Sequence, residues 1–402
     1  MTRQQKRQIF NALFVVVFAV TLGFAVVNPF FPIYMKTITG QGIGIALVFS
    51  GFFLAKMIFT PLLCRWSDFI NRRTFILCGL ALHTCIAFLF FLLPENILLI
   101  LFLRFIQGAA TAMVRPIAQA FVGDISPEHR EGSAMGAFDV SFYAALGIGP
   151  IIGGIIGDSL GYRAMFLILF ILCLAALFIA AIAVESLEPS QPNLRSSVRY
   201  EMNIFRNQTL QGLFAFLFTR SFGIVVLPIF LPLLLRTRFQ TSYIEIGICA
   251  AAGSVTTAVL LGWMGKLSDR WDRKILITTG GLLSGILILV LPMAHDYWQI
   301  IALTVAQAFF STLSLPASSA MLIDKGRKYG LGQTMGIAHT LMNIGFFMGP
   351  LAAGLLMDAL GLGSVFWAAG LAGIAGSLFF AIHCPANDEA RDDRCRWERF
   401  RA

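Results

Sequence analysis

Residues Arg104 to Asp158 read RFIQGAATAMVRPIAQAFVGDISPEHREGSAMGAFDVSFYAALGIGPIIGGIIGD, and this stretch reveals how the whole chain is organised. Two long apolar segments, each with a few charged or glycine positions, flank a short polar turn at Gly123–Glu131. The same outline returns 200 residues later, where the identical pairs are Gln107 and Gln307, Pro116 and Pro316, Asp124 and Asp324, Gly132 and Gly332, Met135 and Met335, Gly136 and Gly336, Gly149–Pro150 and Gly349–Pro350, Gly154 and Gly354, Asp158 and Asp358, and Gly161 and Gly361. So many identities at one offset indicate a tandem repeat of two halves.

Composition places the chain in a membrane. Its residues are 57% hydrophobic and 13% charged, whereas a soluble domain carries about 25% charged residues. Apolar runs of about twenty residues recur along the chain, and each can cross a hydrocarbon core about 30 Å thick. In lipid only helices and closed barrels satisfy every backbone hydrogen bond, and these runs are too long for barrel strands. The chain is therefore expected to be an all-α polytopic membrane protein.

Twelve transmembrane helices are expected, six in each half. They lie at approximately 9–35, 43–63, 74–93, 97–122, 134–157, 163–184, 209–235, 244–264, 274–293, 299–323, 333–357 and 362–383. The predicted domains are an N-terminal six-helix half at 1–184, a cytoplasmic linker at 185–207, a C-terminal six-helix half at 208–384 and a cytoplasmic tail at 385–402. The first span is too long for a cleavable signal peptide.

The placement of basic residues predicts the orientation. With the N-terminus in the cytoplasm, most of the 30 Lys and Arg residues lie in the termini, the central linker and the loops on the cytoplasmic side. Only Lys36, Arg163, Arg236 and Arg238 lie in loops on the other side. Both termini are therefore expected in the cytoplasm of a plasma or inner membrane. This asymmetry accounts for the net charge of +9, and no nucleic-acid partner is expected.

The seven cysteines include no CxxC pair and no obvious partners on the outer side. We expect no disulfide, no metal site and no cofactor.

Two loops carry similar polar motifs. The chain reads CRWSDFINRR at 64–73, after the second span, and GKLSDRWDRK at 265–274, after the eighth. The second copy resembles the loop motif G-x-x-x-D-R-x-G-R-R of the major facilitator superfamily. Its positions are held by Gly265, Asp269, Arg270, Arg273 and Lys274, with Asp272 in place of the second glycine. The first copy keeps Asp68, Arg72 and Arg73 but departs from the pattern at Cys64 and Phe69.

Two further motifs point to the same superfamily. RFIQGAATA at 104–112 resembles its R-x-x-Q-G-x-x-x-A motif, and GPIIGG at 149–154 resembles the G-P-x-x-G-G signature of its drug:H⁺ antiporter branch. The resemblance covers essentially all spans. It implies two pseudo-symmetric six-helix halves around a central cavity whose exposure alternates between the two sides of the membrane.

A set of glycines and prolines in the fifth and eleventh spans predicts close helix packing. Its members are Gly149, Pro150, Gly153, Gly154, Gly349, Pro350 and Gly354. One interpretation is a pliable seam between the halves, and the alternative is ordinary close packing within a half. The recurrence in the second half favours the seam.

The charged loop residues also have two interpretations. Asp68 and Asp269 stand beside basic residues, and Asp124 is available to Arg72 or Arg73. These groups either form a network that holds the cytoplasmic side shut or anchor the loops through solvated ion pairs worth about 0–1 kcal/mol each.

Ionisable residues inside spans are the candidate functional residues, because a charge in mid-membrane costs at least about 2.5–3.5 kcal/mol. They are Lys56, His83, Arg104, Arg115, Asp139, Arg220 and His339, with Gln107 and Asn28 as polar companions. Asp139 is the only carboxylate well inside a predicted span, and His339 is its repeat equivalent. Asp139 is either a proton-coupling site or the ion-pair partner of Arg115. His83 is expected to be a core or interface histidine.

The expected function is secondary active transport without enzymatic activity. We expect proton-coupled efflux of a small amphipathic molecule by a monomer. Four cations against one carboxylate in the predicted cavity favour an anionic or zwitterionic substrate. The alternatives are an uptake carrier or facilitator for an organic anion, and a membrane sensor of the same fold that transports nothing.

Overall fold

The computed structural model describes residues 3–69, 71–92, 95–126, 131–184, 202–326 and 331–384. Residues 185–201 of the predicted linker and the whole predicted tail at 385–402 lie outside the described residues, and so does the side chain of Asp68.

The described chain is all-α. The helices are α1 Arg3–Val27, α2 Phe31–Thr39, α3 Gly42–Phe69, α4 Arg72–Phe91, α5 Ile97–Ile125, α6 Glu131–Ala183, α7 Gln208–Arg238, α8 Tyr243–Ser268, α9 Arg273–Val290, α10 Tyr297–Gly326, α11 Leu331–Leu360 and α12 Leu362–His383, with short 3₁₀ helices η1 Met202–Arg206 and η2 Leu291–Met293. Eleven of these helices are long and apolar enough to cross a membrane. Because α6 has 53 residues and turns at Gly161, it supplies two spans, and the predicted twelve are confirmed.

Two of the boundaries between helices lie at a glycine or a proline. Gly161 adopts φ 75° and ψ −173°, so the fifth and sixth spans meet there almost without a loop. The predicted first span at 9–35 is not continuous, because α1 ends at Val27 and a turn precedes α2. Pro29 in that turn has no N–H to continue the helix.

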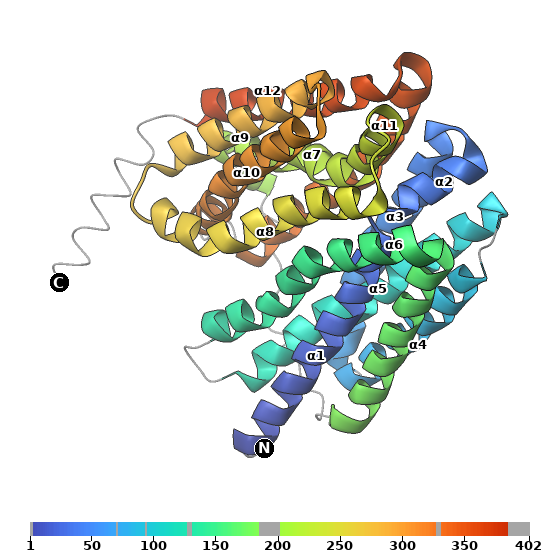
Figure 1. Ribbon diagram of the computed structural model, residues 1–402. Coiled ribbons are helices and arrows are strands. Elements are labelled where there is room, and N and C mark those ends of the chain that lie inside the picture. The colour runs from blue at the N-terminus through green and yellow to red at the C-terminus, as the bar shows by residue number, and fades with distance from the viewer. Residues whose placement is uncertain are drawn as a thin grey trace, which may run out of the picture.

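Figure 1 shows the two halves meeting at one end and diverging toward the end where α6 begins and α8 finishes. The contacts between the halves join the first part of α6 to α8 and α3 to α11. Ser50 of α3 donates a hydrogen bond to the Phe347 carbonyl of α11 at 2.9 Å. Across the α6–α8 contact, the Tyr243 hydroxyl donates to that of Tyr162 at 2.8 Å. We call this the closed end.

Glycines allow the halves to touch at the closed end. A Cβ on Gly154 would overlap the Tyr243 backbone of α8, and a Cβ on Gly354 would overlap Ala46 of α3. The Pro150 carbonyl occupies the space that a side chain at position 247 would need. Small residues of this kind let helices approach closely in lipid.

The other glycines of the predicted seam pack inside their own halves. Gly149 and Gly153 lie against Ala25 and Val26 of α1, and Gly349 lies against Val225 of α7. The predicted set therefore divides into glycines that join the halves and glycines that pack α6 and α11 onto neighbours in the same half.

A symmetric pair of carboxylates also joins the halves at the closed end. Asp158, in the last part of the fifth span, accepts the backbone N–H groups of Tyr243 and Ile244 at 2.9 Å each. Asp358, its repeat equivalent in α11, accepts those of Gly42 at 2.6 Å and Ile43 at 2.8 Å. Each carboxylate thereby satisfies the free N–H groups at the start of a helix in the opposite half and meets the positive end of its dipole.

Candidate functional site

A cavity of about 340 Å³ lies between the two halves, within the size range of small-molecule sites. Its polar lining comes mainly from the N-terminal half and consists of Thr21, Asn28, Lys56, His83, Arg104, Thr111, Arg115 and Gln119. Its aromatic lining consists of Phe24, Phe49, Phe52, Phe53, Phe142 and Phe346. The rings of Phe53 in α3 and Phe346 in α11 lie 5.6 Å apart, so they join the two halves at the cavity wall.

Arg104 is enclosed by aromatic rings. Its guanidinium carbon lies 3.6 Å from the centre of the Phe31 ring and 5.2 Å from that of Phe49, and the residue is only 3% exposed. Its Nη1 donates to Gln107 Oε1 at 3.0 Å. Arg104 lines the central cavity, whereas Gln107 is not among the lining residues. The aromatic rings engage most of the guanidinium.

Arg115 is engaged by a carboxylate and a ring. Its Nη2 lies 3.2 Å from Asp139 Oδ1, and its guanidinium carbon lies 3.5 Å from the centre of the Phe142 ring. Gln119 also donates to Asp139 Oδ1, at 3.1 Å. The side chains of Arg115 and Asp139 are each about one third exposed, at 32% and 35%. The ion pair considered from the sequence thus forms, and it leaves the carboxylate within reach of water.

Lys56 differs from both arginines. It lines the cavity from α3, and its Nζ contacts no hydrogen-bond acceptor or carboxylate among the described residues. The described lining residues include no carboxylate, and Asp139 already pairs with Arg115. The cavity therefore presents one uncompensated ammonium beside aromatic rings.

Two predicted cavity residues lie elsewhere. Arg220 of α7 lines a separate small pocket within the C-terminal half, where it donates to Ser311. His339 is exposed on α11 and is not among the residues that line the central cavity. His83, which was expected in the core, is 4% exposed, and its Nε2 lies 3.3 Å from Thr111 Oγ1 at the cavity wall.

The family comparison adds to this geometry. The family model of the Major Facilitator Superfamily matches residues 13–222 and again residues 213–394, which is one match for each half. The chain belongs to the major facilitator superfamily. It is accordingly a multi-pass membrane transporter of small molecules.

Individual relatives are distant but cover most of the chain. The uncharacterized MFS-type transporter MJ1560 of Methanocaldococcus jannaschii is 25% identical over 361 residues, covering 88% of this chain and 92% of that protein. Quinolone resistance protein NorA of Staphylococcus aureus is 24% identical over 362 residues, covering 88% of this chain and 90% of NorA. A solved bacterial homolog of the human lysosomal transporter Spinster, in an inward-facing and unoccupied conformation, has a TM-score of 0.77 at 14% identity and covers 95% of this chain and 96% of its own, which supports the fold.

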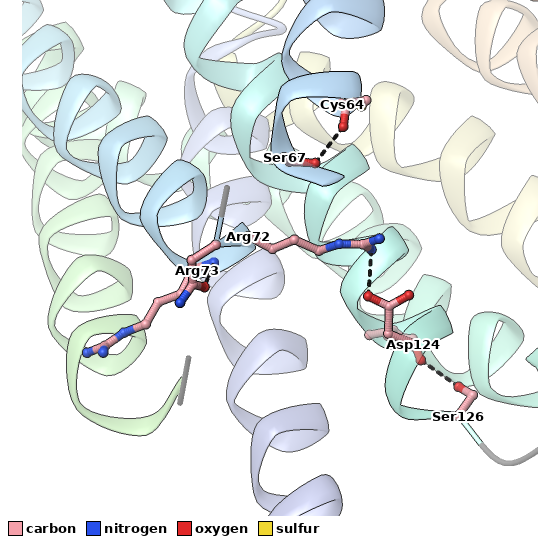
Figure 2. A network of polar contacts seen from close by, with 8 residues as sticks. Cys64, Ser67, Arg72, Arg73, Asp124 and Ser126 are labelled. Atoms are coloured by element: carbon pink, nitrogen blue, oxygen red, sulfur yellow. Dashed lines mark hydrogen bonds and ion pairs between the residues drawn. The ribbon is translucent and has the colours of Figure 1, made fainter. Parts of the chain in front are cut away.

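The superfamily loop motifs form ion pairs inside each half. Arg72, the first residue of α4, lies 3.1 Å from Asp124 at the end of α5, and Arg273, the first residue of α9, pairs with Asp324 of α10. Figure 2 shows Arg72 reaching toward Asp124 while Arg73 extends the opposite way, where it donates to the Ala181 carbonyl of α6 at 2.6 Å. Neither ion pair crosses between the halves.

Within the second motif, Asp272 caps α9 and Lys274 donates to the Cys384 carbonyl, whereas three other described positions have no such contacts. Asp269 and Arg270 are exposed, and neither side chain has a partner among the described residues. A Cβ at Gly265 would meet no atom within 4 Å. These motifs lie at the ends of α3 and α8, and the end of α8 lies at the diverging end in Figure 1.

Two sets of contacts between the halves were not predicted from the sequence. The closed-end carboxylates Asp158 and Asp358 were visible as repeat identities, but no role was assigned to them. The Phe53–Phe346 contact had no local signal, because phenylalanine occurs 38 times in the chain.

Proposed function

We propose that this transporter is a secondary active exporter of small amphipathic anions or zwitterions, driven by inward proton movement. It acts as a monomer in the plasma or inner membrane, with both termini in the cytoplasm. The distribution of Lys and Arg supports this orientation. In it, the cavity of the present conformation faces the cytoplasm, where an exporter loads its cargo. The similarity to NorA, named as a quinolone resistance protein, supports efflux.

The free ammonium of Lys56 supports the choice of substrate most directly. An anionic group beside Lys56 gains a charge-assisted hydrogen bond, and an aromatic or aliphatic body gains contact with Phe52, Phe53 and Phe346. A lipophilic cation would find no unpaired carboxylate among the described lining residues.

Asp139 is the proposed proton carrier. Its carboxylate is paired with Arg115 and bonded to Gln119, and about one third of the side chain is exposed. The proton and the Arg115 guanidinium compete for this carboxylate, so the ion pair and the protonated carboxyl group alternate during the transport cycle. In an exporter driven by inward proton movement, substrate loading and proton release go together, so Asp139 gives up its proton when the substrate binds.

Proton movement on substrate binding tests this function. We expect purified protein in weak buffer to release protons when an anionic aromatic substrate is added, and Asp139→Asn to abolish this release. Asp296→Asn is the matched control, because Asp296 caps α10 away from the cavity and asparagine caps a helix equally well. Proton release that survives in Asp139→Asn would remove this residue from the coupling mechanism.

Net flux in proteoliposomes with and without a proton gradient separates the alternatives. A facilitator for organic anions equilibrates the same substrates whether or not the gradient is applied, and an uptake carrier moves them in the direction opposite to an exporter. A sensor binds them without flux. Transport of cationic dyes with no competition by anionic amphiphiles would contradict the substrate class.

A further inference from the structure

A second pocket lies inside the C-terminal half, between α7, α9, α10 and α12. Its volume is about 30 Å³, enough for a monatomic ion or one to two waters. Glycines leave this space open, and the polar residues around it are Thr219, Arg220, Ser284, Gln307, Ser311, Ser314 and Ser377. Ile224 lines both this pocket and the central cavity, so the two spaces adjoin.

Two of the pocket hydroxyls have protons to donate. Arg220 Nη2 donates to the Ser311 carbonyl at 3.2 Å and to Ser311 Oγ at 3.1 Å, and Gln307 Nε2 donates to Ser284 Oγ at 3.0 Å. Both hydroxyl oxygens therefore act as acceptors. Neither donates its own proton to an acceptor among the described residues.

The neighbouring hydroxyls are different, because each donates to a backbone carbonyl. Thr219 donates to the Ala215 carbonyl at 3.0 Å, Ser314 to the Ser311 carbonyl at 2.9 Å and Ser377 to the Gly373 carbonyl at 2.8 Å. Of the hydroxyl groups among the described lining residues, only those of Ser284 and Ser311 remain as donors for an occupant of the pocket.

The charge of the pocket is positive. No carboxylate is present among its described lining residues, and Arg220 forms no ion pair with a described carboxylate. A cation inside a membrane span is costly unless a partner or water compensates it. A guanidinium and two free hydroxyl protons around one small space form a donor set that suits an anion rather than a cation.

We propose that this pocket binds a chloride-sized inorganic anion. The bound anion accepts hydrogen bonds from Ser284 and Ser311 and neutralises Arg220. The pocket is too small for the body of an amphipathic substrate, so the site is distinct from the central cavity. It holds its ion whether the transporter exports or imports its cargo.

Chloride binding to the purified full-length protein tests the proposal. We expect thermal unfolding at constant ionic strength to occur at a higher Tm in chloride or bromide than in gluconate, whose anion is too large for the pocket. Equilibrium dialysis with radioactive chloride should give one ion per chain. Ser284→Ala and Ser311→Ala should each weaken chloride binding by about fivefold, through loss of one hydrogen bond to the anion.

The variants distinguish this pocket from other anion sites. Arg220→Gln should abolish the difference between chloride and gluconate. Lys56→Gln is the matched control, because it removes a cation from the central cavity and should leave chloride binding unchanged. If Arg220→Gln fails to fold, the serine variants decide, since both retain the charge and Ser311→Ala retains the carbonyl that holds Arg220.

Three outcomes would overturn the proposal. The first is an equal Tm in chloride and gluconate with no bound chloride, which means that water alone fills the pocket. The second is loss of chloride binding in Lys56→Gln, which places the ion in the central cavity. The third is unchanged chloride affinity in both serine variants.

Discussion

Among the described residues, three cations line the central cavity, and the neighbours of each give it different chemistry. Arg104 is stacked on Phe31 and bonded to Gln107, while Arg115 is paired with Asp139. Lys56 alone among them has no partner in the part of the chain that the structure describes. An incoming anion therefore gains most at Lys56, because the arginines would have to exchange an existing interaction.

Replacement of Lys56 should reduce affinity selectively for anions. We expect Lys56→Gln to weaken binding of a fluorescent aromatic sulfonate by about tenfold, from loss of one charge-assisted hydrogen bond. Lys56→Arg should retain most of the affinity because it keeps the charge. Fluorescence titration of both variants measures this, with Lys36→Gln as a control outside the cavity lining. Equal affinity in wild type and Lys56→Gln would contradict the assignment.

At the residue scale, the sequence located the charged positions inside the spans but not most of the groups that they contact. Lys56, Arg104, Arg115 and Asp139 stand out in apolar spans because charges there are costly. Their partners depend on how long side chains extend between helices. The enclosure of Arg104 by Phe31 and the separate pocket around Arg220 were therefore not predictable from local sequence.

Among the elements, α6 and α11 carry the contacts that hold the halves together. Each presents one carboxylate to the first N–H groups of a helix in the other half. The repeat made Asp158 and Asp358 visible, but their donors lie 85 and 316 residues away along the chain. A sequence pattern within one segment does not show which distant backbone N–H groups a carboxylate accepts.

Removal of these carboxylates should open the closed end. A helix-capping interaction is worth about 1 kcal/mol, so Asp158→Ala and Asp358→Ala should each favour the alternative conformation by about fivefold. A cysteine is introduced into the central cavity, and a thiol reagent is added from the closed end. The labelling rate of that cysteine measures the shift in conformation. Asp296→Ala is the control, because Asp296 caps α10 within a single half. An unchanged labelling rate in both variants would show that the glycine contacts suffice.

The whole molecule consists of two halves that meet at one end and diverge at the other (Figure 1). The repeat and the twelve spans predicted this architecture, because span length and a fixed offset are properties of the sequence alone. Which end is closed could not be predicted. The loop motifs left open whether their charges hold the cytoplasmic end shut, and the contacts between the halves form at the opposite end.

Distances at the two ends should change in opposite directions during transport. Spin labels at exposed Ala137 and Lys266 report on the diverging end, and labels at exposed Gln41 and Leu360 report on the closed end. On addition of substrate and a proton gradient, we expect the distance at the diverging end to shorten and the distance at the closed end to lengthen. Pulsed electron paramagnetic resonance measures both distances. Simultaneous lengthening of both would contradict rocking of two rigid halves.

The closed-end carboxylates bond to main-chain atoms, and this has a consequence for how the protein can vary. The donors at positions 42, 43, 243 and 244 are present whatever side chain stands there. Proline is the single exception, since it lacks the N–H yet fits the first turn of a helix. Substitutions at Ile43 and Ile244 therefore keep these carboxylate hydrogen bonds. Position 42 is restricted to glycine, because a Cβ there would lie 2.8 Å from the Gly354 carbonyl oxygen, and Tyr243 also supplies a hydroxyl bond to Tyr162.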